Sequence, residues 1–350
     1  MAFNLGSVQI SEARTTIIAE AGVNHLGRDD YAKMLVDAAV NAGVDIIKFQ
    51  TYTAEKLTTK DAPRFWNWKG ETNQSGSQFD SYSQLDKFSR EQYRELINYC
   101  TKKSIEFMST PFDLEAVDLL MDLGVNGFKI ASCDITNKPL LTYVAQTNKP
   151  IFLSTGAAEM SEIHRAVDTL IDNGSSKLSL LHCTLSYPTK IEDANLSALI
   201  QLRSEFPGLT LGLSDHTLET TTPSLAVMLG ARVIEKHFTF DKSLPLSADH
   251  WLSVDEAGMK SLIEGVRMAE HSYGTGRKEV LPVEQLARQN ARRSIVASQE
   301  MPLGHTLRQI DLDYKRPGTG LDPYSSELVI GRKLKINVKK DHIIKIEDVF

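Results

Sequence analysis

The sequence predicts an α/β fold, a (β/α)8 TIM barrel, followed by a small β-rich domain. Eight short apolar segments of β-type composition occur within the first 240 residues of the 350-residue chain, and helical segments separate most of them. Buried strands that alternate with helices are typical of a parallel sheet. Eight strands favour a closed barrel, because an open doubly wound sheet places fewer polar strand ends at one point.

Each predicted strand ends in polar residues, as strands of TIM-barrel enzymes do where their C-terminal ends carry the active site. In chain order the strands are residues 16–18 ending at Glu20, 45–47 at Lys48 and Gln50, 107–108 at Ser109 and Thr110, 127–130 carrying Lys129 and ending at Ser132 and Asp134, 151–153 at Ser154 and Thr155, 178–181 at His182 and Thr184, 209–213 at Ser214, Asp215 and His216, and 232–234 at Glu235 and His237. Apolar residues at helical spacing predict helices over 29–42, 89–104, 114–123, 139–147, 161–173, 196–206, 222–230 and 255–273.

Strand–helix alternation ends near residue 275, and the rest of the chain predicts a second domain. We expect a barrel domain over residues 1–280, a linker over 281–291 and a compact β domain over 292–350. Segments 296–312 and 336–349 each contain a turn, a His, a β-branched or Leu step and an Asp, which predicts two similar halves. A Pro/Gly loop, KRPGTGL (315–321), lies between them and carries Arg316.

Composition excludes several classes of function. The net charge of −6, without any Lys/Arg-rich block, argues against a nucleic-acid partner. No apolar run approaches the ~20 residues of a membrane span, and the N-terminal residues lack a signal-type apolar region. We therefore expect a cytoplasmic protein with no membrane contact. The three cysteines occur singly, which argues against a disulfide framework or a zinc knuckle. Cys133 and Cys183 follow strands, where a nucleophile could lie, but the favoured interpretation is that they are small buried residues.

Two histidines at the ends of the last two strands are candidate metal ligands. Ser214 and His216 face one side of their strand, and Glu235 and His237 face one side of the next. Neutral imidazoles from adjacent strands are good ligands for a divalent ion. A general acid–base role or a buried structural role remains the alternative for each histidine. His25 and His182 are further candidates that spacing does not rank.

Two lysines lie inside apolar strands, where an ammonium ion is costly unless it is paired. One interpretation of Lys48 and Lys129 is structural, with ion pairs to Glu20 or Asp134. The functional interpretation is an anion site, to which short hydroxyls at the strand ends would add donors. Those hydroxyls belong to Thr110, Ser132, Ser154 and Ser214. A Schiff base on either lysine is a competing use.

Residues 61–82 interrupt the alternation with aromatic, Gly, Ser and Asn residues. A connection this long is usually a functional lid or a disordered insert. Its aromatic run RFWNW (64–68) could close over a substrate or pack on the surface.

Eight motifs along the chain resemble those of the sialic acid (N-acetylneuraminate) synthase family, which includes legionaminic and pseudaminic acid synthases. They are IIAEAGVNHLG (17–27), IIKFQTY (46–52), STPFD (109–113), FKIASCDITNKPLL (128–141), LSTG (153–156), LLHCTLSYPT (180–189), LGLSDHT (211–217) and VIEKHFT (233–239). The tail resembles the family's antifreeze-like (SAF, β-clip) domain. The resemblance implies a transferase that condenses phosphoenolpyruvate with an N-acetylated amino sugar, such as N-acetylmannosamine, to a nine-carbon 2-keto acid.

The resemblance also implies roles for individual residues. His216 and His237 match the ligands of a divalent ion, Mn²⁺ or Mg²⁺. Residues matching the phosphoenolpyruvate site are Lys48, Thr110, Lys129, Ser132, Ser154 and Ser214. Those matching positions around the acceptor sugar are Gln50, Asp134, Tyr187 and Asp249. Glu20 matches an acidic residue beside the reacting centre. Arg316 matches an arginine that reaches a neighbouring subunit's active site, which implies a domain-swapped homodimer.

In the family, the metal polarises the sugar aldehyde, carbon 3 of phosphoenolpyruvate attacks it, water adds at carbon 2, and phosphate leaves by C–O cleavage. This chain departs from the common pattern at two positions near the acceptor. Ser247 and Ala248 precede Asp249 where members often have Gly-Pro, and Asp134 stands where many have Glu. The acceptor therefore stays open between N-acetylmannosamine and diacetamido 6-deoxy sugars. A Schiff-base aldolase, or a glycan- or ice-binding module on a barrel scaffold, are alternatives of other classes.

Overall fold

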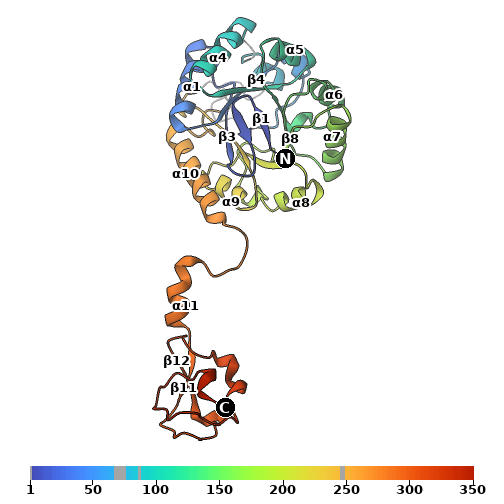
Figure 1. The fold of residues 1–350 in the computed structure, drawn as a ribbon. Coiled ribbons are helices and arrows are strands. Elements are labelled where there is room, and N and C mark those ends of the chain that lie inside the picture. The colour runs from blue at the N-terminus through green and yellow to red at the C-terminus, as the bar shows by residue number, and fades with distance from the viewer. Residues whose placement is uncertain (1, 67–75, 86–87, 245–248) are drawn as a thin grey trace. The chain divides into compact units, whose positions relative to one another are not determined.

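A closed barrel of eight parallel strands forms the centre of the first of two compact units, Met1–Gly274 and Thr275–Phe350 (Figure 1). The computed structural model describes residues 2–66, 76–85, 88–244 and 249–350. Around the barrel the strand order is β10-β3-β4-β5-β6-β7-β8-β9. The strands are β3 (Thr16–Gly22), β4 (Ile46–Thr51), β5 (Glu106–Pro111), β6 (Phe128–Ile130), β7 (Ile151–Ser154), β8 (Leu178–Cys183), β9 (Thr210–Asp215) and β10 (Val233–His237). The predicted barrel is thus confirmed.

Most barrel strands extend further toward their C-terminal ends than the apolar segments alone predict. β4 includes Lys48 and Gln50, and β10 continues through His237. The parallel ladders pair Glu20 with Lys48 on one side of β3 and Glu20 with His237 on the other. Glu20, Lys48 and His237 therefore lie on regular, hydrogen-bonded backbone, and that backbone fixes their relative heights.

The predicted helices surround the barrel and differ from the prediction only at their ends. They are α1 (Asp29–Ala42), α4 (Arg90–Lys102), α5 (Leu114–Asp122), α6 (Lys138–Gln146), α7 (Met160–Asp172), α8 (Ala198–Glu205), α9 (Thr222–Met228) and α10 (Glu256–Tyr273). Local signals set these ends. Gly43, with φ +82°, ends α1, because the left-handed conformation favours glycine. Ser89 and Gln92 form a capping box at the start of α4.

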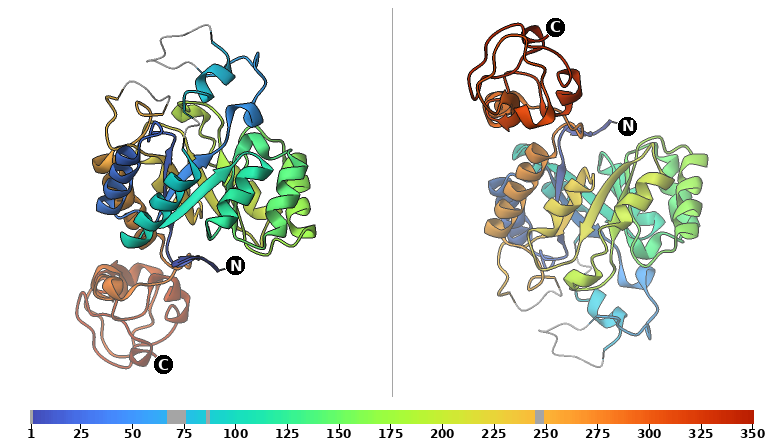
Figure 2. Two further views of the ribbon diagram at one scale, coloured as in Figure 1. Left: turned by 90° about the horizontal axis from the view of Figure 1, so that it is seen from above. Right: turned by 90° about the horizontal axis from the view of Figure 1, so that it is seen from below.

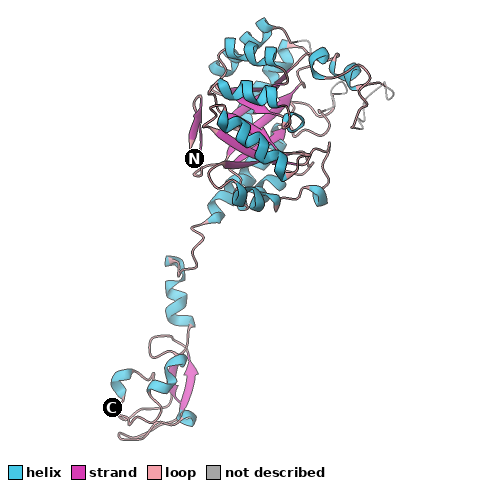
Figure 3. Cartoon of the chain, turned by 90° about the vertical axis from the view of Figure 1, so that its right-hand side faces the viewer, coloured by secondary structure: helices cyan, strands magenta, loops and turns pink. Residues whose placement is uncertain are grey.

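An antiparallel hairpin closes the N-terminal end of the barrel, and no sequence pattern predicts it. It consists of β1 (Phe3–Leu5) and β2 (Val8–Ile10), and lies beside one end of the barrel in Figure 3. Leu5 and Ile10 are fully buried and pack against the residues that fill the barrel interior, including Met108. This apolar plug leaves the opposite end, where the strands finish, for polar chemistry.

The long connection after β4 contains two short helices, α2 (Ala54–Leu57) and α3 (Gln78–Tyr82). Ser77 begins α3 with a capping box to Asp80. Figure 2 shows this connection extending beyond one end of the barrel. Residues 67–75 of the predicted insert lie outside the described residues.

The first α-helix of the second unit is α11 (Gln285–Ala291), and the unit has a small core of its own around Ile295, Leu307 and Leu334. Strands β11 (Ser294–Ala297) and β12 (Leu312–Lys315) pair antiparallel. The repeat seen in the sequence corresponds to two similar turns. His305 Nε2 lies 3.0 Å from the Asp311 carboxylate, and His342 Nε2 lies 3.1 Å from that of Asp348. None of the helices in the described part of the chain is long and apolar enough to cross a membrane.

Candidate active site

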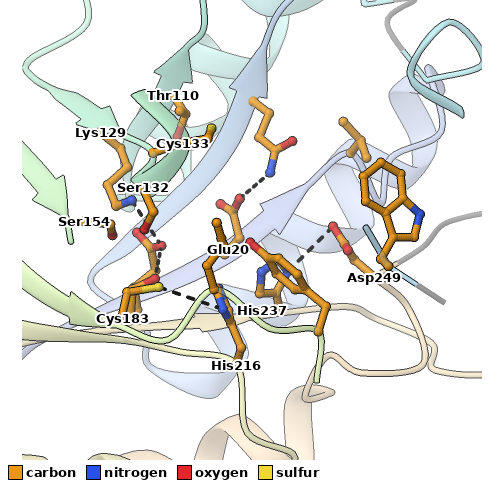
Figure 4. A pocket seen from close by; sticks show the side chains of 18 of the residues that line it. Glu20, Thr110, Lys129, Ser132, Cys133, Ser154, Cys183, His216, His237 and Asp249 are labelled. Carbon is orange, nitrogen blue, oxygen red and sulfur yellow. Dashed lines mark hydrogen bonds and ion pairs between the residues drawn. The ribbon is translucent and has the colours of Figure 1, made fainter. Parts of the chain in front are cut away.

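The C-terminal ends of the barrel strands surround a cavity of about 170 Å³ (Figure 4). Twelve of the site residues predicted from the sequence line it: Glu20, Lys48, Gln50, Thr110, Lys129, Ser132, Ser154, Tyr187, Ser214, His216, His237 and Asp249. They come from every strand of the barrel or from the segment that directly follows one. The parallel sheet thus brings together residues that are up to 229 positions apart, from Glu20 to Asp249.

A buried cluster of two carboxylates and two ammonium groups occupies the floor of the cavity. Lys48 Nζ lies 3.0 Å from Glu20 Oε2 and 3.4 Å from Glu235 Oε2. Lys129 Nζ lies 3.6 Å from Glu235 Oε1. The predicted pairing of Lys48 with Glu20 is therefore present, whereas the partner of Lys129 is Glu235 rather than Asp134. All four side chains are at most 6% exposed.

The two lysines differ in how well their charge is compensated. Burial alone lowers the pKa of Lys48, but the charges of Glu20 and Glu235 outweigh burial and raise it. Burial lowers the pKa of Lys129, and Glu235 only partly offsets that effect. Burial also raises the pKa of Glu20, against the opposing charge of Lys48. Lys129 is thus the cation with the most to gain from a bound anion.

Hydroxyl groups surround this cluster. Lys48 Nζ donates to Thr110 Oγ1 at 3.2 Å, and Ser214 Oγ donates to Glu235 Oε1 at 2.9 Å. Ser154 Oγ is buried and has no hydrogen-bond partner among the described residues. A buried hydroxyl without a partner costs free energy, so Ser154 is a donor held ready for a ligand.

Glycine keeps the wall open beside Ser132 and Cys183. Gly156 N donates to Ser132 Oγ at 3.0 Å. A Cβ at Gly156 would lie 2.8 Å from Ser132 Oγ and 3.1 Å from Cys183 Sγ, closer than real Cβ atoms approach without displacement. Cys133 and Cys183 both line the cavity. Cys183 is buried, as predicted, whereas Cys133 is exposed, so the prediction that Cys133 is a small buried residue was wrong.

The two candidate metal ligands lie side by side. The ring centroids of His216 and His237 are 5.3 Å apart. His216 Nδ1 lies 2.9 Å from the carbonyl oxygen of Thr184, so Nδ1 carries a proton and, in the neutral ring, Nε2 has the free lone pair. Burial lowers the pKa of His216, but Cys183 and the hydrogen bond to Thr184 outweigh burial and raise it. Burial lowers the pKa of His237 well below its usual value, which keeps that ring neutral.

His237 Nδ1 is a buried nitrogen without a hydrogen-bond partner in the described structure, although the Asp249 carboxylate is 3.6 Å away. Two adjacent imidazoles, one of them with an unsatisfied nitrogen, fit a divalent ion. Among the described residues no group of three His, Cys, Asp or Glu side chains could hold a metal. An ion held by these histidines would therefore complete its coordination with water or substrate.

A second group of polar side chains converges beside Gly22, on the side of the cavity away from Ser154. Gln50 Nε2 donates to Glu20 Oε1 at 2.8 Å. A Cβ at Gly22, which has φ +54°, would lie 3.3 Å from Asp249 Oδ2 and 3.5 Å from Gln50 Nε2. Burial, with the nearby charge of Glu20, raises the pKa of Asp249 to about 7. The ring of Tyr187 packs on His216 with centroids 4.2 Å apart.

Two predicted residues lie elsewhere. Asp134 is in a 3-10 helix, η1 (Ser132–Asp134), where its Oδ1 accepts from Asn137 Nδ2 at 3.0 Å, and it does not line the cavity. Arg316 belongs to the second unit, directly after β12. Its predicted role in a neighbouring subunit stays a prediction.

The other two histidine candidates do not join the pair. His25 packs its ring on Phe88, with centroids 4.4 Å apart, and His182 Nε2 bonds the carbonyl oxygen of Ala194 at 2.9 Å. Neither residue lines the cavity.

Several lining residues were missing from the predicted site. Glu235 is the most important, and its position two residues before His237 placed it on the same strand face. The outer part of the cavity is largely apolar, with Phe65, Trp66, Tyr82, Leu85, Phe112, Leu185, Trp251 and Leu252. Phe65 and Trp66 belong to the predicted aromatic run, of which Asn67 and Trp68 lie outside the described residues, as do Ser247 and Ala248. No signal in the sequence marked Trp251.

Comparison with known proteins places the chain among synthases of nine-carbon sugar acids. Residues 35–278 match the NeuB family and residues 292–349 match the SAF domain. The chain is 41% identical to the N,N'-diacetyllegionaminic acid synthase of Legionella pneumophila, over 92% of this chain and 91% of that one. It is 31% identical to the N-acetylneuraminate-9-phosphate synthase of Mus musculus, over 95% and 92%.

The crystal structure of an N-acetylneuraminic acid synthetase from Leptospira borgpetersenii, in complex with citrate, is similar in fold. The TM-score is 0.73 at 35% identity, and the similarity covers 82% of this chain and 95% of that chain. The family match, the level of identity and the shared barrel agree, and the chain belongs to the NeuB family, with a SAF domain at its C-terminal end.

Proposed function

We propose that this protein is a nonulosonic acid synthase that condenses phosphoenolpyruvate with an N-acetylated amino sugar and releases phosphate. The observation that carries the proposal is the composition of the cavity. An under-compensated cation, Lys129, and an unsatisfied hydroxyl, Ser154, lie in the same cavity as two adjacent imidazoles. A polyanionic substrate and a divalent ion would satisfy these groups. The names of the relatives support the same reaction class.

Phosphoenolpyruvate would bind at the end of the cavity that holds the lysines. Lys48 and Lys129 supply positive charge for its phosphate and carboxylate, and Thr110, Ser132 and Ser154 lie beside them as hydroxyl donors. In a buried site such fixed donors stabilise developing charge strongly, because they need little reorganisation. Glu235 holds both ammonium groups in place through its two carboxylate oxygens.

A divalent ion, Mn²⁺ or Mg²⁺, would be held by His216 Nε2 and by His237. When bound, it would act as a Lewis acid toward the open-chain aldehyde of the sugar. The hydrogen bond from His216 Nδ1 to Thr184 selects the tautomer that presents Nε2. Asp249 lies beside His237 and, with its pKa raised to about 7, can hold or release a proton near neutral pH.

In the reaction, carbon 3 of phosphoenolpyruvate forms a bond with the aldehyde carbon, water adds at carbon 2, and the tetrahedral intermediate expels phosphate. Lys129 does not need to form a covalent bond in this scheme. Its Nζ lies 3.6 Å from Glu235 Oε1, and this ion pair favours an electrostatic role over a Schiff base.

The apolar outer wall favours a second candidate within the same class. Leu185, Trp251 and Leu252 would contact the part of the acceptor furthest from the aldehyde. A diacetamido-trideoxy hexose carries a methyl group where N-acetylmannosamine carries a hydroxymethyl group, and an apolar wall prefers the methyl group. A legionaminic-acid-type synthase is therefore the second candidate.

Arg316 is proposed to complete the cavity of a neighbouring subunit in a domain-swapped homodimer. The support is its motif, KRPGTG, on a loop of the second unit. Sedimentation velocity would test for a dimer, and Arg316→Ala should reduce turnover without altering the sedimentation coefficient. Because phosphoenolpyruvate is a cytoplasmic metabolite, the reaction is proposed to take place in the cytoplasm.

Phosphate release from phosphoenolpyruvate tests the proposed function. We expect release that requires an acceptor, stops after chelation and returns with Mn²⁺. His237→Ala should abolish it, whereas His164→Ala, a change at an exposed helix position, should not. Full activity after rigorous metal removal, or no release with N-acetylmannosamine or any diacetamido sugar, would contradict the proposal. Borohydride trapping of a substrate on Lys129 would instead support a Schiff-base aldolase.

A further inference from the structure

Each candidate metal ligand directly follows a buried charged residue that takes no part in the cavity. Asp215 precedes His216, and Lys236 precedes His237. Asp215 and Lys236 are in-register partners of the neighbouring strands β9 and β10. Because successive side chains of a strand point to opposite faces, these two lie on the outer face of the barrel, opposite the histidines.

These two residues form an ion pair with almost no solvent contact. Lys236 Nζ lies 2.7 Å from Asp215 Oδ2, and the side chains are 1% and 2% exposed. Lys236 also donates to the carbonyl oxygens of Thr217 and Glu219, the latter at 3.0 Å. Asp215 Oδ1 accepts from Thr217 N at 3.0 Å, and its Oδ2 accepts from Thr217 Oγ1 at 3.1 Å.

The network joins three parts of the fold. It contains the end of β9, the end of β10 and the segment that leads into α9, where Thr217 Oγ1 and Thr222 Oγ1 lie 3.1 Å apart. Moving two charges out of water is expensive, and well-packed apolar residues often stabilise a fold equally well. A network with this many directional bonds differs from an apolar contact because it fixes distances between backbone segments.

His216 lies next to the backbone segments that this network holds together. Strand β9 ends at Asp215, so His216 lies just beyond the regular ladder. The last in-register pair between β9 and β10 is Asp215 with Lys236, one residue before each histidine. The ion pair therefore lies where the two strands would otherwise be free to separate.

We propose that the Asp215–Lys236 ion pair is a positioning device that sets the separation of the His216 and His237 imidazoles and thereby the affinity for the divalent ion. This inference rests on the proposed metal site. Loss of the pair would let the strand ends move apart, so that the two nitrogens no longer reach one ion. Outer-shell supports of metal ligands typically change metal affinity by about 10- to 100-fold.

The test compares Mn²⁺ affinity in full-length variants. Lys236→Met keeps the length of the side chain and removes the charge. Arg267→Met is the matched control, because Arg267 pairs with Glu270 at 2.9 Å and donates to the carbonyl oxygen of Thr15, which precedes β3 at the other end of the barrel. Free Mn²⁺ is measured by electron paramagnetic resonance at a temperature where each variant is folded.

We expect Lys236→Met to raise the Kd for Mn²⁺ at least tenfold, and Arg267→Met to change it less than twofold even if it lowers the melting temperature. Phosphoenolpyruvate affinity without metal should stay within about threefold in both, because Lys48 and Lys129 lie on β4 and β6. If Lys236→Met does not fold, Asp215→Asn, which keeps the shape of the side chain, should still raise the Kd several-fold.

An unchanged Kd in Lys236→Met, or in Asp215→Asn where only that variant folds, overturns the proposal. An equal loss of affinity in Arg267→Met also overturns it, because general destabilisation would then explain the effect. His237→Ala separates this failure from failure of the metal site itself. Equal Mn²⁺ binding by His237→Ala and the unaltered protein would remove the proposed metal site and the positioning role with it.

Discussion

Replacing each buried lysine of the cavity by methionine should change stability in opposite directions while weakening the same ligand. Lys48 has two carboxylate partners, at 3.0 and 3.4 Å, and these raise its pKa. Lys129 has one carboxylate partner among the described residues, at 3.6 Å, and burial lowers its pKa. Lys48 therefore stabilises the cluster of buried charges, whereas Lys129 destabilises it.

The distances give the expected magnitudes. With an effective dielectric constant of about 20, the attractions of Lys48 are roughly 5.5 and 4.9 kcal/mol, and the attraction of Lys129 is roughly 4.6 kcal/mol. Each buried ion also loses several kcal/mol of hydration. For Lys48 the attractions exceed that loss, so its removal should cost about 3–5 kcal/mol, the usual price of breaking a buried pair. For Lys129 the two effects nearly cancel, and repulsion by Lys48 favours its removal.

The sign for Lys129 follows from proton linkage. Because its pKa in the folded protein is below the unfolded value, the charged form costs stability at neutral pH, and that cost falls as the pH rises through the folded pKa. Lys129→Met removes the cost. Differential scanning calorimetry of chelator-treated protein should therefore show a melting temperature at or above that of the unaltered protein. Lys48→Met should melt roughly 10 °C lower.

Both variants should bind phosphoenolpyruvate about 10- to 100-fold more weakly by titration calorimetry, since each loses a charged hydrogen bond of about 1.5–3 kcal/mol. Lys260→Met, on the exposed face of α10, is the control and should change neither the melting temperature nor the affinity for phosphoenolpyruvate. Equal destabilisation by the two cavity substitutions, or unaltered phosphoenolpyruvate binding in Lys129→Met, would refute this reasoning.

Two further predictions concern single polar groups. Ser154→Ala should leave the melting temperature unchanged or raise it, because the substitution removes a buried hydroxyl without a partner among the described residues. The same substitution should raise the Kd for phosphoenolpyruvate about tenfold. A loss of stability with normal phosphoenolpyruvate binding would contradict this prediction. Hydrogen bonds from Arg308, with a further one from His305, hold the pKa of Asp311 below its usual 3.8. The Asp311 carboxylate therefore stabilises the second unit above pH 3.8, and this stabilisation is lost as the pH falls through the pKa of Asp311 in the folded protein. Asp311→Asn should therefore lower the temperature of the second unit's calorimetric transition at neutral pH and make that temperature less dependent on acid pH. Tryptophan fluorescence, which reports residues before 275, should show an unchanged barrel. If the transition temperature kept its acid dependence, Asp311 would be excluded as the source of that dependence.

The barrel and most of the site could be predicted because both follow from short-range patterns. Strand alternation placed His216 and His237 on inward faces, and apolar neighbours marked Lys48 and Lys129 as buried. The ion-pair partners of the buried lysines could not all be predicted in the same way. Lys129 pairs with Glu235, which is far away in the chain, because β6 and β10 face each other across the barrel rather than lying side by side.

The remaining features were not predicted because the chain departs from regular strand geometry there. After β6 the chain forms the 3-10 helix Ser132–Asp134, whose three-residue turn replaces strand alternation, so Ser132 lines the cavity while Asp134 does not. The N-terminal hairpin closes the barrel only through contacts with distant strands, which short apolar segments do not reveal. Trp251 reaches the cavity from the segment between β10 and α10, where no periodic pattern exists.

Labelling the bridging oxygen of phosphoenolpyruvate tests the proposed condensation most directly. The protein would be incubated with Mn²⁺, an N-acetylated amino sugar and phosphoenolpyruvate carrying oxygen-18 between carbon 2 and phosphorus. Mass spectrometry would then measure the oxygen-18 content of the released phosphate. Attack of water at carbon 2 predicts that the phosphate keeps the label and that its release requires the sugar. Unlabelled phosphate, or labelled phosphate released equally well without a sugar, would contradict the proposed reaction.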